Sequence, residues 1–325
     1  MMQSNLFAVV VTFNGMEWIS KCLDSLLGSE KEIGIIVVDN ASTDGTAEWI
    51  RQNYPQIYLI DSKENRGFAR ANNLGIARAL ILGAEAVFLL NQDAFTEPET
   101  VGRLSDAMAK HPQFGILSPL HLNGDGTALD FGFENYLKSD STASNNSLER
   151  IRKGAVINLE AVSSDPPISI DFVNAAAWLV SKACLRDAGG FCPLFFMYGE
   201  DLEYVRRANM AGYKIGVLPG AVIHHAREKK EIRSDTFSMK SEMAAFERAF
   251  LNTSLHPALS SSERFLALLL SFGHGFRRVV SQQPGSFFRF YIHKVRLWRK
   301  LKSEIELLPS NRTAFRFIPD LTGKS

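Results

Sequence analysis

The sequence predicts an α/β protein with a mostly parallel central sheet flanked by helices. Two observations support this prediction. Short apolar runs rich in β-branched residues alternate with amphipathic stretches in the first third of the chain, which is typical of β-α-β units. Three polar clusters, TFN, VDNASTDG and LLNQDA, directly follow apolar runs. These clusters are expected at the carboxyl ends of the strands, the edge of an open parallel sheet at which ligands bind.

The first β-α-β unit is expected to begin with a strand over residues 6–13, where β-branched and aromatic residues follow one another. The next segment, NGMEWISKCLDSLLG, has apolar residues at helical spacing, and IGIIVVD returns to strand character. The pattern then repeats, with helices expected at AEWIRQNY and ARANNLGIARALILG and strands at IYLI and AEAVFLL.

The regular pattern is interrupted after residue 93. Pro119 and several glycines precede the polar segment KSDSTASNNSLERIRKG, which lacks apolar periodicity and predicts a surface excursion. Regular structure is expected again in ISIDFVNAAAWLVS, through GGFCPLFFMYGEDLEYVRRANMAGY and in KIGVLPGAVIHH. We therefore expect one domain over 1–227, with halves 1–118 and 119–227, and a helical C-terminal region over 228–325.

The overall composition is that of an ordinary globular protein. The 325 residues are 46% hydrophobic and carry a net charge of +1, which gives no reason to expect a nucleic-acid partner. Cys22, Cys184 and Cys192 have no CxxC spacing, so neither a disulfide framework nor a zinc cluster is expected, and a cytoplasmic location fits best. The apolar run near the N-terminus lacks a basic leader and a cleavage site, and no run approaches the roughly 18 residues that span a bilayer.

The cluster VDNASTDGT places Asp39 and Asn40 at the end of a buried strand. Ser42, Thr43 and Asp44 fit a turn and helix cap as well as they fit a ligand site. Asp39 precedes the cap, and its carboxylate is expected to face the crevice, where it can accept the imide N-H of uracil or thymine.

Two further clusters supply polar groups at the same edge. ENRGFARANNLG contributes Asn65, Arg66, Gly67 and Asn72, which either hold a nucleotide or form a turn and caps. Asp93, in LLNQDA, ends a buried strand, where an unpaired carboxylate is costly. It is a suitable oxygen ligand for Mg²⁺ or Mn²⁺ bound to a diphosphate, unless it caps the turn before Pro98.

Taken together, VVVTFN, VVDNASTDGT, NRGFARANN, VFLLNQDA, FFMYGEDLEYVRRANMAGY and LPGAVIHH resemble the family 2 inverting glycosyltransferases of GT-A fold, especially the bacterial rhamnosyltransferase-like branch. The resemblance covers about residues 6–225, with the motifs in the expected order. It implies a donor nucleotide sugar held by the first half, an acceptor bound by the second half and a divalent cation between them.

Several donor-site roles follow from this resemblance. Thr12 and Asn14 fall on the nucleotide contact after the first strand, and Asp39 falls on the base-binding acid. Asp93 matches the last acid of the DxD-type metal motif, in which Asn91 replaces the first Asp and leaves a single carboxylate. The resemblance also places His225 on the histidine that contacts metal or diphosphate, although strand-end histidines such as His224 and His225 are often structural.

The resemblance aligns Asp201 with the general base that deprotonates the acceptor hydroxyl in an inverting transfer. Glu200 is expected to orient the acceptor or to cap the helix. The alternative is a helix start whose acids stabilise the helix dipole, with Glu203 and Arg207 as an ordinary i,i+4 pair. Trp178 is expected either to stack on the acceptor or to lie in the core.

Residues 277–302 carry eight Lys or Arg and no acid, with Phe288, Tyr291, Val295 and Trp298 at helical spacing. This basic amphipathic segment is expected to contact the inner face of a membrane or to pack on the catalytic body.

The sequence thus predicts transfer of a sugar, with rhamnose as a candidate, from a dTDP or UDP donor. The expected acceptor is a glycan or lipid-linked glycan of a bacterial surface polysaccharide. Nucleotidyl transfer to sugar phosphates and non-catalytic nucleotide-sugar binding are the alternatives, although VTFNGMEW is not the glycine-rich loop that nucleotidyl transfer favours.

Overall fold

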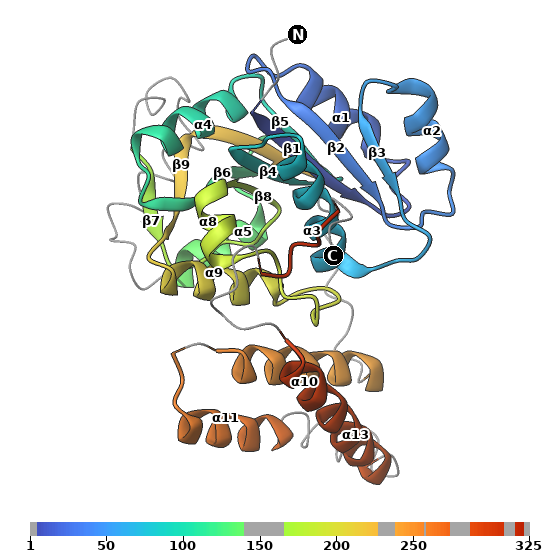
Figure 1. Cartoon of the computed structure of the whole chain (residues 1–325), viewed down its shortest axis with the longest axis vertical. Coiled ribbons are helices and arrows are strands. Elements are labelled where there is room, and N and C mark those ends of the chain that lie inside the picture. The colour runs from blue at the N-terminus through green and yellow to red at the C-terminus, as the bar shows by residue number, and fades with distance from the viewer. Residues whose placement is uncertain are drawn as a thin grey trace.

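The structure, a computed structural model, describes residues 5–139, 166–226, 238–256, 258–273, 287–308 and 316–321. In this part of the chain a nine-stranded mixed sheet is flanked by helices, and a group of helices follows it (Figure 1). The predicted α/β class is therefore confirmed. Most of the polar segment 138–154 and the 277–286 part of the basic segment lie outside the described residues.

The first half of the sheet is parallel, with strand order β3-β2-β1-β4. Its strands β1, β2 and β4 are almost wholly apolar and buried, as expected of parallel strands covered on both faces. The predicted β-α-β units are confirmed, with α3 starting two residues earlier than expected. The elements are β1 (Leu6–Thr12), α1 (Ile19–Leu27), β2 (Gly34–Asp39), α2 (Thr46–Asn53), β3 (Tyr58–Asp61), α3 (Gly67–Ile81) and β4 (Ala86–Asn91).

The second half of the sheet mixes strand directions. Here β8 lies antiparallel between β4 and β6, β9 runs parallel to β6, and the short strands β5 and β7 pair antiparallel with β9. Helix α4 was not predicted, although Val101, Leu104 and Met108 are buried on one of its faces. The elements are β5 (Ala94–Thr96), α4 (Thr100–Lys110), β6 (Phe114–Asn123), α5 (Phe131–Ser139), β7 (Ile168–Ile170), β8 (Ala177–Ser181), α8 (Lys182–Ala188), α9 (Glu200–Met210) and β9 (Lys214–His225).

An irregularity in the pairing of β6 with β9 directs the end of β9. Pro119 pairs with Leu218 but Leu120 pairs with Val222, so residues 219–221 fall outside the register. Pro219, which has no N-H to donate, lies in this gap. Beyond it, His224 and His225 pair with β5, beside the end of β4.

Two apolar layers, one on each side of the sheet, hold the sheet-containing body together. A third apolar cluster joins Cys192 and Phe195, which precede α9, to Phe250, Leu251 and Leu301 of the C-terminal helices. These helices are α10 (Met239–Ser254), α11 (Ser261–Gly273) and α13 (Phe287–Glu306). Figure 1 shows α10 next to the sheet-containing body and α11 beyond it. The domain division at residue 227 stays a prediction.

The last described segment, 316–321, packs against the sheet-containing body. The carbonyl of Arg316 accepts from Gly190 N (2.7 Å), and the carbonyl of Phe317 accepts from Asn73 Nδ2 (3.0 Å). Gly189 has φ of 85°, and a Cβ there would lie 2.3 Å from the Arg316 carbonyl oxygen. Glycine is therefore required where the two segments meet.

Cys22, Cys184 and Cys192 are buried and have free thiols in the structure. None of the described helices is both long and apolar enough to cross a membrane.

Candidate active site

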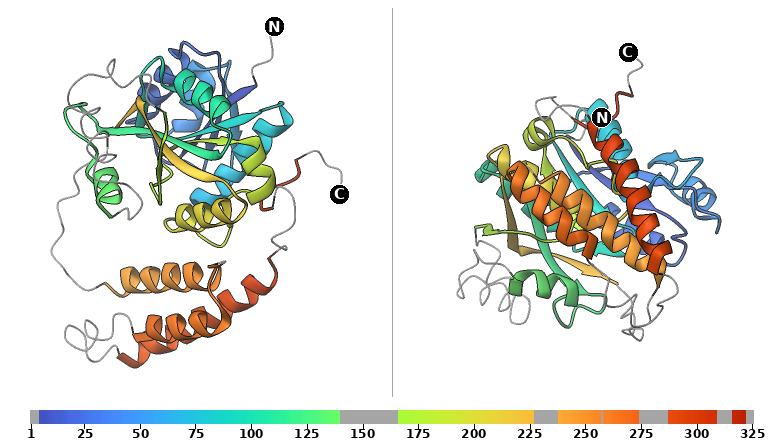
Figure 2. Two further views of the ribbon diagram at one scale, coloured as in Figure 1. Left: turned by 90° about the vertical axis from the view of Figure 1, so that its left-hand side faces the viewer. Right: turned by 90° about the horizontal axis from the view of Figure 1, so that it is seen from below.

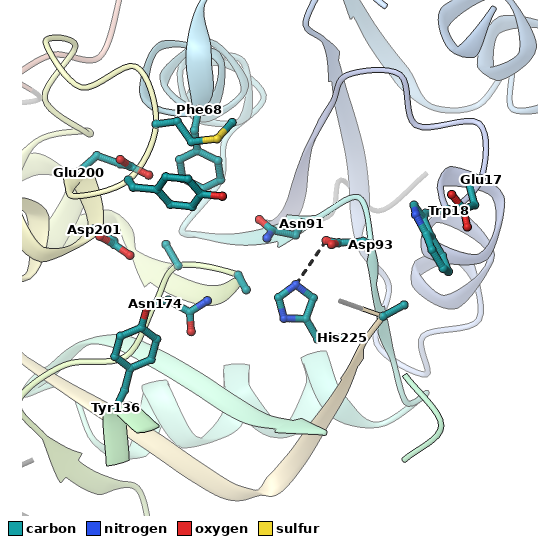
Figure 3. Close-up of a pocket in the computed structure, with 15 residues that line it drawn as sticks. Glu17, Trp18, Phe68, Asn91, Asp93, Tyr136, Asn174, Glu200, Asp201 and His225 are labelled. Atoms are coloured by element: carbon teal, nitrogen blue, oxygen red, sulfur yellow. Dashed lines mark ion pairs between the residues drawn. The ribbon is translucent and has the colours of Figure 1, made fainter. Parts of the chain in front are cut away.

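A cavity of about 630 Å³ opens where β4 and β9 end and α9 begins (Figure 3). Parts of the chain far apart in sequence supply its walls, because the parallel strands and the start of α9 converge there. The lining residues are Glu17, Trp18, Phe68, Asn91, Asp93, Tyr136, Asn174, Ala175, Ala176, Met197, Tyr198, Glu200, Asp201, His225 and Ala226.

Asp93 and His225 lie together on one wall of the cavity. Nε2 of His225 is 3.4 Å from Oδ1 of Asp93 (Figure 3). His225 is buried, and neither of its ring nitrogens makes a hydrogen bond. An oxygen and an imidazole nitrogen therefore converge at a point where a divalent cation is a suitable partner.

His224 lies apart from this pair. Its Nε2 is 2.7 Å from Oε1 of Glu97, and both residues line a separate surface depression. The structural alternative considered for a strand-end histidine thus describes His224. His225 is the histidine that lines the cavity, because successive side chains of a strand alternate in direction.

Glu200 and Asp201 form the opposite wall at the start of α9 (Figure 3). Burial raises the pKa of Asp201, although the backbone N-H groups of Leu202, Ala175 and Gly199 oppose the rise. Burial and the neighbouring Asp201 charge raise the pKa of Glu200 to about 8, and its Oε2 has no hydrogen-bond partner. Two adjacent carboxyl groups thus occupy different environments.

A constrained turn sets the position of this pair. Tyr198 has φ of 69° and Gly199 has φ of 98°, so two consecutive residues adopt left-handed backbone conformations. For tyrosine this conformation costs energy, and such strain is common at functional sites. The turn brings the aromatic ring of Tyr198 and the carboxylates of Glu200 and Asp201 to the same cavity.

The predicted pair of Glu203 and Arg207 is present, but it is buried rather than exposed. Arg207 Nε and Nη2 donate to the two oxygens of Glu203 at 2.6 and 2.7 Å. The guanidinium also donates to the carbonyls of Ala188 and Gly190. This pair therefore fixes α9 to the segment that leads into the site.

Asp39 lies outside the cavity, at the end of β2. One carboxylate oxygen accepts from Ser42 N at 2.9 Å, and the other is buried without a hydrogen-bond partner. The nearby loop is held by its own side chains. Asn14 Oδ1 accepts from Thr43 N at 2.8 Å, and Asp44 accepts from Met16 and Thr46. The turn-forming interpretation of Asp44 is thereby confirmed.

Asn40, Asn65 and Gly67 form an internal hydrogen-bond network. Asn40 Nδ2 donates to Asn65 Oδ1 (2.9 Å), which also accepts from Gly67 N, and Asn40 Oδ1 accepts from Arg66 N. The Arg66 side chain is half-exposed near Glu64. These residues tie β2 to α3, and their predicted contact with the donor remains a prediction.

Three side chains with predicted ligand contacts are enclosed by protein, and for Trp178 the core alternative fits the structure. Trp178 has no exposed surface and packs among Phe191 and Tyr204, so it cannot stack on an acceptor. Asn72 is buried and donates to Phe68 O within its own helix. Thr12 is fully buried and donates to Gln92 Oε1 at 2.6 Å.

Sequence reasoning missed several lining residues, of which Asn174 is the most informative. Asn174 is 7% exposed, its Oδ1 has no hydrogen-bond partner, and it lies between Asp201 and His225 (Figure 3). The available signal was its place three residues before β8, as a polar residue in the apolar run VNAAAWLV. Trp18 was assigned only to a helix, Phe68 lies just before the predicted start of α3, and Tyr136 lies on the unpredicted α5.

The fold and the cavity together define a class of protein, an α/β protein with a polar site at the carboxyl edge of its sheet. Comparison with known proteins supplies the family. The family model described as glycosyl transferase family 2 matches residues 7–154.

Among curated proteins, the N-acetylglucosaminyl-diphospho-decaprenol L-rhamnosyltransferase of Mycobacterium tuberculosis is 28% identical over 67% of this chain and 75% of its own length. The dTDP-rhamnosyl transferase RfbF of Shigella flexneri is 25% identical over 71% of this chain and 72% of its own length.

Solved structures show the same fold. The TarS 1-349 fragment of S. aureus superposes with a TM-score of 0.54 at 16% identity, covering 86% of this chain and 75% of the fragment. A mannosyltransferase of Pyrobaculum calidifontis, solved with GDP-Man and Mn²⁺, gives 0.53 at 16% identity over 93% of this chain and 87% of that one. Residues 7–154 thus match a glycosyl transferase family 2 domain, and the chain is similar to rhamnosyltransferases in sequence and to solved glycosyltransferases in fold.

Proposed function

We propose that this glycosyltransferase transfers a hexose, with rhamnose as the first candidate, from a nucleoside-diphosphate sugar to a glycan hydroxyl, with inversion at the anomeric carbon. One observation carries the proposal. The Asp201 carboxylate and the Asp93 and His225 pair line a single cavity from opposite walls. Proton removal at Asp201 and binding of the leaving diphosphate at Asp93 and His225 can therefore occur on opposite sides of the bound sugar.

The chemistry follows from the position and environment of Asp201. The acceptor hydroxyl oxygen bonds to the anomeric carbon while the bond from that carbon to the diphosphate oxygen breaks. The hydroxyl proton passes to Asp201, and the nucleoside diphosphate leaves. The raised pKa of Asp201 makes its carboxylate a stronger base than an ordinary aspartate, which suits general base catalysis near neutral pH.

Asp39 is proposed to bind the base of a dTDP or UDP donor. Its buried, unpartnered oxygen can accept the imide N-H that uracil and thymine share. Burying an unpaired carboxylate oxygen is costly, and a ligand hydrogen bond would offset that cost.

Asp93 and His225 are proposed to hold Mg²⁺ or Mn²⁺. Within the described residues no group of three or more His, Cys, Asp and Glu side chains is arranged to hold a metal. Two protein ligands are nevertheless sufficient for an ion that also binds substrate phosphates, as Mg²⁺ commonly does. Such an ion would neutralise charge on the leaving diphosphate.

The acceptor is proposed to be a glycan or lipid-linked glycan of a bacterial surface polysaccharide, at the cytoplasmic face of the membrane. The support is the similarity to a relative whose name specifies a diphospho-decaprenol acceptor. Nucleotidyl transfer to sugar phosphates is the less favoured alternative, because the matching family model is one of glycosyl transfer.

Thermal shift with UDP, dTDP and GDP sugars, with and without Mn²⁺, tests the donor site. We expect stabilisation by a pyrimidine nucleotide sugar, and no stabilisation by any of them would refute the donor assignment. In transfer assays with the identified donor, Asp201→Asn should reduce kcat by about 10²- to 10⁴-fold while donor stabilisation persists. Full transfer by Asp201→Asn, or release of pyrophosphate from a nucleoside triphosphate and a sugar phosphate, would contradict the proposal.

A further inference from the structure

Helix α11 exposes a continuous apolar face. Phe265, Leu266, Leu269 and Leu270 have exposed fractions of 57 to 70%, and their spacing places them on one side of the helix. Single exposed leucines are normal on protein surfaces, but a contiguous group of four large apolar side chains marks a contact surface.

Helix α13 adds a second exposed surface of different character. Phe288, Ile292 and Val295 are exposed at positions i, i+4 and i+7. The same exposed side carries the basic residues Arg289, Arg296, Arg299, Lys300 and Lys302. The predicted apolar stripe through Phe288 and Val295 is therefore not the packed face of this helix.

The packed face of α13 consists instead of Phe290, Lys294 and Leu301, which are fully or almost fully buried. The Lys294 ammonium lies 4.7 Å from the ring centre of Phe246 on α10. Because Lys294 packs against α10, the exposed arginines and lysines lie on the opposite side of α13.

Both exposed faces belong to helices that α10 connects to the sheet-containing body. Helices α11 and α13 each pack on α10, and α10 contacts the body through Asn252, whose carbonyl accepts from Arg206 at 3.2 Å. Figure 2, in the view from below, shows α11 and α13 in front of the sheet. Helix α11 therefore lies beyond α10 from the sheet, whereas the end of α13 that holds Leu301 packs with Cys192 and Phe195.

We propose that these faces of α11 and α13 bind an anionic lipid bilayer. The apolar side chains of α11 enter the boundary between headgroups and acyl chains, and the cations of α13 contact the headgroup phosphates. A basic polar surface next to exposed leucine and phenylalanine is the combination that interfacial helices use. The inference deepens the proposed function, on which it rests for the lipid-linked nature of the acceptor.

Charge favours a bilayer over a second copy of this chain. A two-fold contact through α13 would place its five exposed cations near those of the partner, and Glu304 and Glu306 are too few to balance them. An anionic lipid surface is complementary to the same cations. It also accepts the uncharged α11 face without requiring a shaped partner.

Cosedimentation of the full chain with vesicles tests the proposal. We expect binding to phosphatidylcholine vesicles that contain phosphatidylglycerol, and at least tenfold weaker binding to phosphatidylcholine alone. The double variant Leu266→Glu, Leu270→Glu should lose about tenfold or more of the binding. Arg296→Gln with Arg299→Gln should lose about fivefold for each charge removed, and less at high salt.

A matched control adds two glutamates elsewhere. Leu27 and Ile81, at the ends of α1 and α3, are 44% and 43% exposed and lie outside the proposed surface. The double variant Leu27→Glu, Ile81→Glu should therefore bind vesicles as the wild type does. Absence of vesicle binding by the wild type would overturn the proposal, as would unchanged binding by the Leu266, Leu270 variant. A dimer in light scattering that this variant dissociates, without vesicle binding, would assign the surface to a second copy.

Donor-induced thermal stabilisation, measured without vesicles, separates the two proposals. If vesicle binding fails while donor stabilisation persists, only the bilayer surface is wrong. If donor stabilisation fails while vesicle binding persists, only the proposed function is wrong. Variants that keep the wild-type Tm also exclude loss of binding through unfolding.

Discussion

The buried pair of Glu203 and Arg207 gives a quantitative prediction for Glu203→Gln. Glu203 is 3% exposed and Arg207 is 8% exposed, and two short hydrogen bonds join them. The substitution keeps the shape of the side chain but removes its charge. The guanidinium then stays buried among uncharged partners, which are the carbonyls of Ala188 and Gly190, a neutral amide and the rings of Tyr204 and Phe317.

Breaking a buried ion pair by removing one partner costs about 3 to 5 kcal/mol, because the remaining charge is uncompensated. We expect Glu203→Gln to lower the free energy of unfolding of the catalytic body by this amount in urea titrations. Glu99→Gln is the matched control, since Glu99 and Arg103 form an i,i+4 pair at 3.4 Å in which both side chains are about one-third exposed. Such pairs contribute about 0 to 1 kcal/mol.

The comparison between the two variants decides the outcome. If Glu203→Gln costs no more than Glu99→Gln, Arg207 is not held by a desolvated charge, and the argument from burial fails. If the stability falls as expected, a second consequence follows. The segment 188–190 loses its anchor, so loss of activity should accompany loss of stability.

Two further predictions concern the cavity. Because the folded state raises the pKa of Glu200 from 4.5 to about 8, its protonated form stabilises the fold at low pH; unfolding free energy should decline from about pH 4.5 to 8. Glu200→Gln should flatten that decline in urea titrations across this range, and an unchanged slope would contradict the assignment. Asn174→Ala should lower kcat/KM about 10- to 100-fold through a lost substrate hydrogen bond, while Tm stays the same or rises because the buried Oδ1 has no partner. A lower Tm with unchanged kcat/KM would make Asn174 a structural residue.

The parallel half of the fold was predictable from local pattern. Strands β1, β2 and β4 are buried on both faces, so each is a short apolar run bounded by polar turns, and the helices between them have apolar residues at regular spacing. Asp93 and Asp201 were recognisable because each carboxylate stands at the boundary of a regular element.

Exposure was not predictable in the same way. The residues Thr12, Asn72 and Trp178 lie in motifs that resemble ligand contacts, yet packing encloses each of them. The same limit applies to Glu203 and Arg207, whose i,i+4 spacing is visible in the sequence but whose burial depends on Ala188 and Gly190. The burial of a side chain depends on contacts with segments that are distant in the sequence, so it cannot be predicted from the neighbouring residues alone.

What the sequence determined by itself is the α/β alternation, the polar ends of the strands and the candidate acids, because periodicity and residue chemistry are local properties. The resemblance already favoured His225 over His224, but only the tertiary structure decided that His225 lies 3.4 Å from Asp93 and that Asn174 lies between this pair and Asp201. It also decided that α11 and α13 present apolar and basic faces outward. These outcomes depend on an irregular strand pairing and on which helix faces pack against α10, and both are set by contacts between distant parts of the chain.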